Sequence, residues 1–308
     1  MPNISIIIPT YNSEHFIDKT IQSVINQTYK DWELIIVDDL SKDNTSKILE
    51  KWQKKDSRIQ LIFLDKNSGG PAHPKNVAIL KAVGKYVAYL DHDDEWLPQK
   101  LEKQIVLIEN NNSVGLVSCG ALLVNAAGKT FGSYTPPKNK NIFPEILLRN
   151  PIHSNSSVIV RLEIIKEIGS RDEKIKGAED WDMWIRIAKA GYRFAFVHEP
   201  LFKYNFHSTN ATILFGDYEK INDAEYIFNK HLDLYEKFNI LHFELFRLGI
   251  MFLLAKNGKK SRYNFIQSIN KNRFFIPAYI GYILSLLGHL GTTIVQIMIF
   301  FFKKLRRS

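Results

Sequence analysis

A cluster of acidic residues follows an apolar run in the segment YLDHDDEW, residues 89–96. Asp91, Asp93 and Asp94 lie so close together that their like charges repel unless a cation neutralises them. Alternate side chains of an extended backbone point the same way, so we expect the carboxylates of Asp91 and Asp93 to converge. Carboxylate oxygens suit Mg²⁺ or Mn²⁺, which keep open positions for substrate phosphates. The cluster therefore predicts a divalent-metal site, although an isolated motif of this kind is more often a solvated acidic loop.

The first half of the chain alternates apolar runs with amphipathic segments. Short β-branched runs predict strands at residues 5–9, 33–39, 59–65 and 85–91, and helical spacing of apolar residues predicts a helix after each of the first three. Ser13 is expected to cap the first helix. Strands this apolar are normally covered on both faces, which indicates an α/β fold with a mainly parallel central sheet flanked by helices. Ligands of such sheets bind beyond the carboxyl ends of the strands, where the acidic cluster falls.

The pattern is weaker after Glu102, where a strand is expected at 115–125, an apolar run at 156–161, and a helix followed by a strand within 177–197. Glu179 and Asp180 begin that helix. Two acidic residues in a first turn are also favoured by the helix dipole alone, without any catalytic role.

Six segments resemble the motifs of family 2 glycosyltransferases, which have the GT-A fold. In chain order they are SIIIPTYN, IIVDDLSKDNT, NSGGPAHPKNVAI, YLDHDDEW, GAEDWDMWIRIA and the late His207, and they cover roughly residues 1–215. Such enzymes move a sugar from a nucleoside diphosphate to an acceptor hydroxyl, and relatives of this type build bacterial surface glycans or lipid-linked oligosaccharides. The resemblance implies a Rossmann-like GT-A fold, a UDP-sugar donor and direct displacement with inversion at the anomeric carbon.

The resemblance also implies roles for individual residues. Asp93 would coordinate Mn²⁺ or Mg²⁺, Asp91 would support the metal or hold the ribose, and His207 would help to bind metal or diphosphate. Asp180 would act as the general base, with Glu179 beside it. The nucleotide-sugar-binding residues that it implies are Pro9, Thr10, Tyr11, Asn12, Glu14, Asp39, Asn67, Lys75, Asp91 and His92.

Several of these residues have a specific chemical expectation. Asp39 would accept a hydrogen bond from the imide N–H of uracil, and Tyr11 would stack on the base. Lys75 stands where the family usually has Arg, and a lysine cannot make a planar bidentate contact. Asn205 replaces an Arg that many relatives carry two residues before the late histidine. His92 is not expected to bind the metal.

The net charge of +9 comes from the C-terminal part of the chain, because residues 256–308 contain ten Lys or Arg residues and no Asp or Glu. A basic tail around an apolar stretch favours an anionic membrane surface as the partner and disfavours a nucleic acid. We expect a catalytic domain at 1–215, with nucleotide-sugar binding in 1–110 and the acceptor side in 111–215. A helical region at 216–308 would follow, with a membrane-associating segment at 275–308.

The run from Ile276 to Phe302 carries no formal charge and is long enough to span a bilayer once. Proline and glycine interrupt it, and basic residues on both flanks prefer the cytosolic side. Two short helices that meet near Gly288–Gly291 in one leaflet fit these charges better than a single span or a soluble pair packed on a partner chain. No signal peptide is expected, so the predicted location is the cytoplasmic side of the cell membrane.

The sequence thus predicts a metal-dependent inverting glycosyltransferase whose glycan acceptor would be carried on a polyprenyl diphosphate. A catalytically silent nucleotide-sugar-binding protein is one alternative. A nucleotidyltransferase on a related fold is another, but it would need a glycine-rich basic loop after the first strand, and PTYNSEH is not one. A metal-dependent phosphodiesterase would need more histidine than the acidic cluster supplies.

Overall fold

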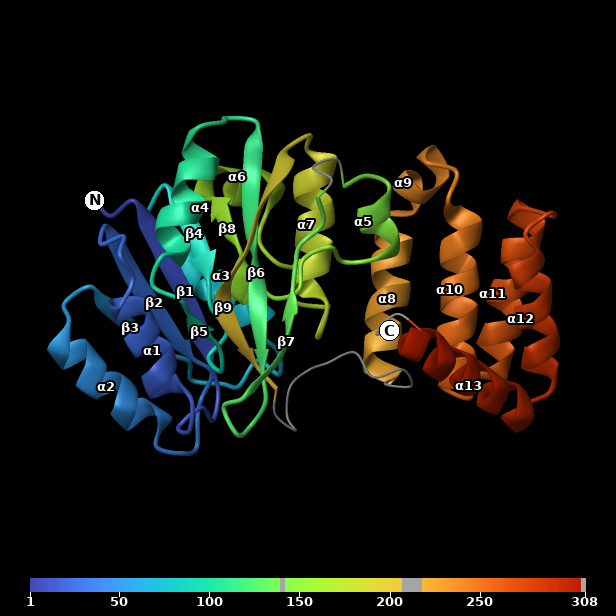
Figure 1. Cartoon of the computed structure of the whole chain (residues 1–308), viewed down its shortest axis with the longest axis horizontal. Helices are drawn as coiled ribbons and strands as arrows, with labels where there is room; N and C mark the ends of the chain where they lie inside the picture. The colour runs from blue at the N-terminus through green and yellow to red at the C-terminus, as the bar shows by residue number, and fades with distance from the viewer. Residues whose placement is uncertain (139–141, 207–217, 306–308) are drawn as a thin grey trace. The chain divides into compact units, whose positions relative to one another are not determined.

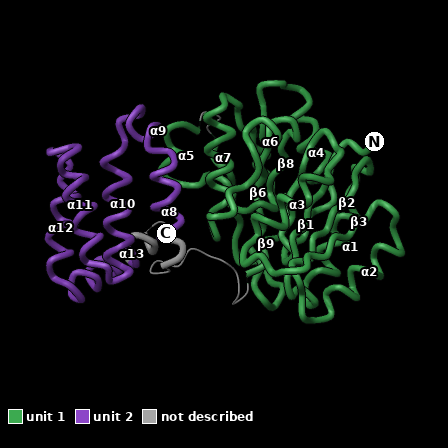
Figure 2. Tube along the Cα trace, turned by 180° about the vertical axis from the view of Figure 1, so that it is seen from behind, with its two compact units in different colours: residues 1–210 green, residues 211–308 purple. Residues whose placement is uncertain are grey.

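The computed structural model describes residues 1–138, 142–206 and 218–305 (Figure 1). The chain divides into two compact units, residues 1–210 and 211–308 (Figure 2). The first unit contains an α/β sheet with its covering helices, and the second is helical throughout its described residues.

In the described part of unit 1, nine strands form one sheet, with eight in the order β3-β2-β1-β4-β8-β6-β9-β5 and β7 paired with β6. The first four strands in that order are parallel, as the sequence predicts, whereas β8 is antiparallel to both of its neighbours. The whole sheet is therefore mixed. The strands are β1 (Ile4–Thr10), β2 (Trp32–Asp38), β3 (Ile59–Phe63), β4 (Tyr86–Tyr89), β5 (Glu95–Trp96), β6 (Val114–Val124), β7 (Thr130–Tyr134), β8 (Ile159–Arg161) and β9 (Arg193–Asn205).

Helices cover the sheet, and every residue of β1 and β2 is buried as a result. In unit 1 they are α1 (Ile17–Ile25), α2 (Thr45–Lys55), α3 (Ala72–Lys81), α4 (Lys100–Glu109), α5 (Glu145–Leu148), α6 (Leu162–Ile168) and α7 (Glu179–Lys189), with a short 3₁₀ helix η1 (Asn155–Ser157).

Ser13 is not the N-cap of the first helix, which begins at Ile17. A turn precedes the helix, in which the Ser13 carbonyl accepts from the N–H groups of Phe16 and Ile17. The Ser13 hydroxyl donates to the Tyr11 carbonyl, 3.1 Å away, and accepts from the Thr10 hydroxyl at 2.8 Å, so its described side-chain contacts lie before the helix.

The parallel register brings three strand ends to one edge. Thr10 at the end of β1 lies opposite Asp38 of β2, and Ile7 lies opposite Tyr89 of β4. Because β1, β2 and β4 all point the same way, Asp39 and the acidic turn after β4 emerge on the same edge as Thr10.

Unit 2 consists of α8 (Tyr218–Lys230), α9 (Leu232–Lys237), α10 (Leu241–Leu254), α11 (Gly258–Lys271), α12 (Ile276–Leu286) and α13 (His289–Leu305) in its described residues. Its long apolar run forms two helices, which are separated at Gly288 by a backbone φ of +56°. None of the helices in the described residues combines the length and the apolar character needed to cross a membrane.

Candidate active site

The acidic cluster is a turn, and the expectation of an extended segment was wrong. The Asp94 N–H donates to the Asp91 carbonyl at 3.1 Å, which closes the turn. Asp94 is fully buried, and its carboxylate accepts from the hydroxyl of Ser156 at 2.6 Å and the N–H of Asn205 at 3.2 Å. Ser154 donates to both Asp91 and Asp94, at 3.3 and 3.4 Å. Serines around η1 therefore fix how the carboxylates of this turn are arranged.

Burial raises the pKa of Asp91 and, more strongly, that of Asp94, and the charge of Asp93 adds to both effects. A cation at this turn would relieve that repulsion. Within the described residues, no group of three or more His, Cys, Asp or Glu side chains is arranged to hold a metal ion. Mg²⁺ is often held by only one or two carboxylates, with substrate phosphates as further ligands, and Asp91 and Asp93 fit that donor set.

Two histidines were considered for this site, and the structure describes the position of His92 but not that of His207. His207 lies outside the described residues. The His92 carbonyl accepts from the Thr20 hydroxyl at 2.8 Å, which ties the acidic turn to α1.

Glu179 is buried at the first residue of α7 and is held by two cations. Its Oε1 atom lies 3.0 Å from Nζ of Lys75 and 3.5 Å from Nη1 of Arg171. Burial alone would raise the pKa of Glu179, but the two cations outweigh it and the net effect is to lower the pKa. Glu179 is therefore ionised, and the cations that bind it leave it poorly placed to exchange a proton with a substrate.

Asp180, the next residue, has the opposite electrostatics. It is half-buried and accepts from its neighbour's N–H, that of Trp181, at 2.7 Å and from Nδ2 of Asn150 at 3.4 Å. Burial, followed by the charge of Glu179, raises the pKa of Asp180 to about 6. A partly accessible carboxylate that titrates near neutral pH matches the requirements of a general base.

Lys75 is almost fully buried, with 2% of its surface exposed. Its ammonium bridges Glu179 to Asp91, whose Oδ1 atom is 3.7 Å away. Lys75 thus connects the start of α7 to the acidic turn.

Arg171 is a site residue that the sequence analysis missed. Its Nη2 atom donates to Oδ1 of Asn155 in η1 at 2.8 Å, and its guanidinium lies 4.4 Å from the ring centre of Tyr89. Its backbone N–H donates to Asn76 of α3, and its carbonyl accepts from that side chain. No sequence motif marks this residue, because its partners come from four separate segments.

The segment after β1 is held against the β2–α2 loop. Asn12 has a backbone φ of +48°, donates its N–H to the Ser41 hydroxyl, and accepts from the N–H of Lys42. Glu14 accepts from both the N–H and the side chain of Asn44. Within this segment, the ring of Tyr11 is exposed, whereas Pro9 and Thr10 are buried in the end of the strand.

Asp39, the residue expected to bind uracil, is buried and contacts the β3–α3 loop. Its two carboxylate oxygens accept from the N–H of Ser68 at 2.9 Å and from the Ser68 hydroxyl at 2.8 Å. Asn67 donates to the Asp39 carbonyl at 2.8 Å. A carboxylate has further lone pairs, so Asp39 can still accept from a ligand.

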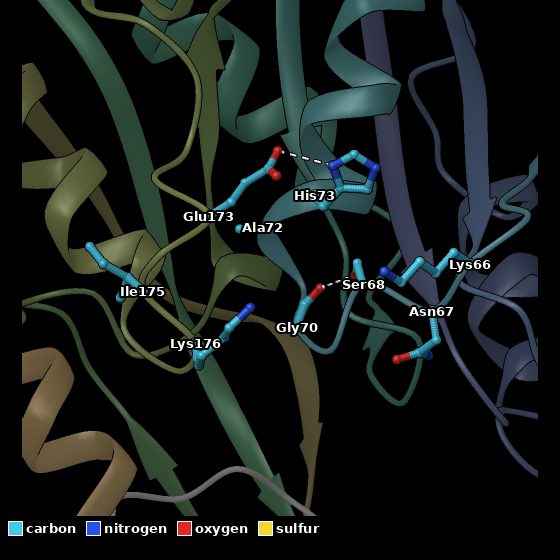
Figure 3. Close-up of a pocket in the computed structure, with 9 residues that line it drawn as sticks. All are labelled: Lys66, Asn67, Ser68, Gly70, Ala72, His73, Glu173, Ile175 and Lys176. Carbon is cyan, nitrogen blue, oxygen red and sulfur yellow. Dashed lines mark hydrogen bonds and ion pairs between the residues drawn. The ribbon is translucent and has the colours of Figure 1, made fainter.

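A pocket of about 270 Å³ adjoins this contact, and Asn67 and Ser68 are among its lining residues. Figure 3 shows Lys66 and Lys176 reaching towards Ser68 and Gly70 from opposite sides. A larger hollow of about 650 Å³ is lined by Asp93 together with residues of α1, the β6–β7 turn and the end of β9. Both hollows lie beside residues that the sequence predicted for the site.

Comparison with known proteins assigns this chain to a family. The model of Glycosyl transferase family 2 matches residues 5–169, more than half of the chain. An uncharacterized glycosyltransferase of Rickettsia prowazekii is 30% identical over 322 aligned positions, which cover all of this chain and 97% of the relative. The putative teichuronic acid biosynthesis glycosyltransferase TuaG of Bacillus subtilis is 33% identical, over 66% of this chain and 79% of its own length.

Solved structures share the fold. TarS 1-349 of S. aureus, in complex with UDP-GlcNAc, has a TM-score of 0.67 at 23% identity, with 88% of this chain and 81% of that one covered. The mannosyltransferase PcManGT of Pyrobaculum calidifontis, in complex with GDP-Man and Mn²⁺, has a TM-score of 0.60 at 20% identity, over 90% and 77% of the two chains. The family match, the full-length relative and the shared fold together show that this chain belongs to glycosyltransferase family 2 and has a GT-A-like fold.

Proposed function

We propose that this glycosyltransferase is metal-dependent and inverting, and that it transfers a sugar from a UDP-sugar to a hydroxyl of a glycan. The observation that carries the proposal is the division of the acidic pair at the start of α7. Glu179 is ionised between two buried cations, whereas Asp180 is partly exposed with a pKa of about 6. One carboxylate is thus fixed as a structural anion, and the next is left to accept a proton.

The strand ends that meet at one edge of the sheet would bind the donor. Asp39 would accept from the imide of uracil, and the exposed ring of Tyr11 would pack on the base. Asp91 and Asp93 would hold Mn²⁺ or Mg²⁺, which when bound neutralises the phosphates of the donor and of the departing diphosphate. PcManGT, which shares the fold, has been solved with Mn²⁺, and this supports the choice of metal.

Asp180 would take the proton from the acceptor hydroxyl while the hydroxyl oxygen attacks the anomeric carbon. In the same step the bond from that carbon to the diphosphate oxygen breaks, and its electron pair leaves with UDP. A single displacement inverts the anomeric centre and needs no covalent intermediate on the protein.

We further propose that the acceptor is a glycan carried on a polyprenyl diphosphate at the cytosolic face of the membrane. Two observations support this. TuaG is named for teichuronic acid biosynthesis. Residues 256–308 of this chain combine basic charge with an apolar run, which suits an anionic membrane surface.

The test is to incubate the full chain with UDP-, GDP- and dTDP-sugars, with Mn²⁺ or with EDTA, and to measure release of the nucleoside diphosphate. We expect turnover of a UDP-sugar that EDTA abolishes. Asp180→Asn should bind UDP and Mn²⁺ like the parent but release no UDP from the donor. Donor binding without any turnover would instead support a nucleotide-sugar-binding protein, and turnover in EDTA would contradict metal dependence.

A further inference from the structure

The two faces of α12 differ in what they contact. Ala278, Gly281 and Ser285 are buried on one face, and a Cβ atom on Gly281 would collide with the ring of Phe265 in α11. Because no side chain intervenes at Gly281, α12 packs closely against α11, and the two helices lie side by side in Figure 1. Its other face remains in solvent although it consists of large apolar side chains, which are Ile276, Tyr279, Ile280, Ile283 and Leu286.

The exposed apolar surface continues past the end of this helix. Leu287 and Leu290, on either side of the glycine that separates α12 from α13, are both exposed, the second at 60%. Phe274, just before α12, is exposed at 94%. Single exposed apolar residues are ordinary, but a contiguous series over one helix and its two ends marks an interaction surface. We call the exposed side of α12, together with Phe274, Leu287 and Leu290, the apolar face.

Basic residues lie next to the N-terminal end of the apolar face, and the sequence around them is free of acidic residues from 256 onwards. Lys271 and Arg273 precede α12 and are exposed. Four more basic residues occur at 303–307, and residues 256–308 contain no Asp or Glu. A second copy packed on the same face would offer these cations no acidic partner from residues 256–308. An anionic bilayer has an apolar interior that can contact the apolar side chains and negatively charged headgroups that can pair with the basic residues.

We propose that the apolar face is a membrane-binding surface that inserts into the headgroup region of an anionic bilayer without crossing it. With its 11 residues, α12 is about 16 Å long, against about 30 Å for a hydrocarbon core. The purpose of this surface, to bring the enzyme to a lipid-linked acceptor, rests on the proposed function. The binding itself does not, and it can be measured without any sugar donor.

The test is flotation of the full chain with vesicles of phosphatidylcholine alone or mixed with phosphatidylglycerol. We expect binding to the mixed vesicles that high salt weakens. Ile280→Glu with Ile283→Glu should lower the partition coefficient about ten-fold or more, because two charges would enter the apolar region. Leu80→Glu with Val106→Glu is the matched control, since both residues are exposed apolar residues on helices of unit 1 and the charge change is the same. The control should bind like the parent.

Other outcomes would overturn the proposal. An equal loss of vesicle binding in both double variants would assign the effect to net charge. Unchanged vesicle binding by Ile280→Glu with Ile283→Glu would exclude α12 as the binding surface. A dimer by light scattering that the first double variant dissociates, together with no vesicle binding by the parent, would assign the face to a second copy. If that variant fails to fold, Lys271→Gln with Arg273→Gln decides, since it should weaken binding only to the anionic vesicles. If the parent floats with anionic vesicles but turns over no UDP-sugar, the proposed function is rejected and this proposal stands.

Discussion

Replacing Asp180 by Asn should abolish transfer and at the same time stabilise unit 1. The activity is lost because the amide cannot accept the acceptor's proton, and a general base typically contributes about 10²–10⁴-fold to the rate. The stability rises because the carboxylate is ionised at neutral pH in a site that disfavours its charge. Asparagine keeps the shape of the side chain without that charge.

The size of the stabilisation follows from the pKa. Asp180 has a pKa of about 6 in the folded protein, against an ordinary value of 3.8. A difference of about two pKa units corresponds to roughly 3 kcal/mol, and solvent screening of a half-buried side chain reduces this to about 1–2 kcal/mol. Below the unfolded-state pKa both states are protonated and there is no cost. Stability is lost as pH rises through the folded-state pKa, so the difference between variant and parent should be complete above about pH 7.

Urea unfolding followed by tryptophan fluorescence measures the effect, because all five tryptophans lie in unit 1. We expect the variant to be more stable than the parent at about pH 7.5, and we expect the difference to be much smaller at about pH 4. A stability difference that is the same at both pH values would refute the electrostatic reasoning. An equal loss of UDP affinity would refute the assignment of Asp180 as the base.

Further predictions test the surroundings of the site and the helical unit. Arg171→Met removes a charge that lowers the pKa of Asp180, so the acidic limb of the pH–rate profile should move to higher pH. Glu179→Gln removes a charge that raises this pKa, so the same limb should move to lower pH. Shifts in the same direction would contradict this. Asp39→Ala should weaken UDP binding about ten-fold in calorimetry by removing the acceptor for the imide, and an unchanged affinity would place uracil elsewhere. Gly281→Val should destabilise unit 2 by about 1–3 kcal/mol, seen as faster amide exchange in α11, and unaltered exchange would show that α11 and α12 can separate freely.

The first four strands and their helices could be predicted from the sequence because hydrophobic periodicity is local. Each of these strands is an apolar run next to a helix in the chain, and parallel neighbours follow from the crossovers. The second half of the sheet could not be predicted in the same way. Its order depends on pairings such as β4 with β8 and β6 with β9, which join segments far apart in the sequence.

The acidic turn shows how a correct location can accompany a wrong geometry. The cluster lies at the predicted edge of the sheet, because the apolar run before it is a buried strand. The carboxylates are arranged by a turn and by hydroxyls of Ser154 and Ser156, more than 60 residues away. The sequence analysis assumed an extended backbone, on which alternate side chains point the same way, and that assumption was wrong. Hydrogen bonds to distant serines leave no periodic pattern in the sequence, so the turn could not be predicted from it.

The amino-acid sequence by itself determined the α/β alternation, the family motifs and the basic, apolar C-terminal segment, because each is a matter of residue type and spacing. Only the tertiary structure decided how Glu179 and Asp180 differ. They are adjacent in the chain, yet one is buried between Lys75, 104 residues away, and Arg171, while the other remains partly open to solvent. The charge state of a carboxylate depends on burial and on distances to other charges, and both are set by the fold.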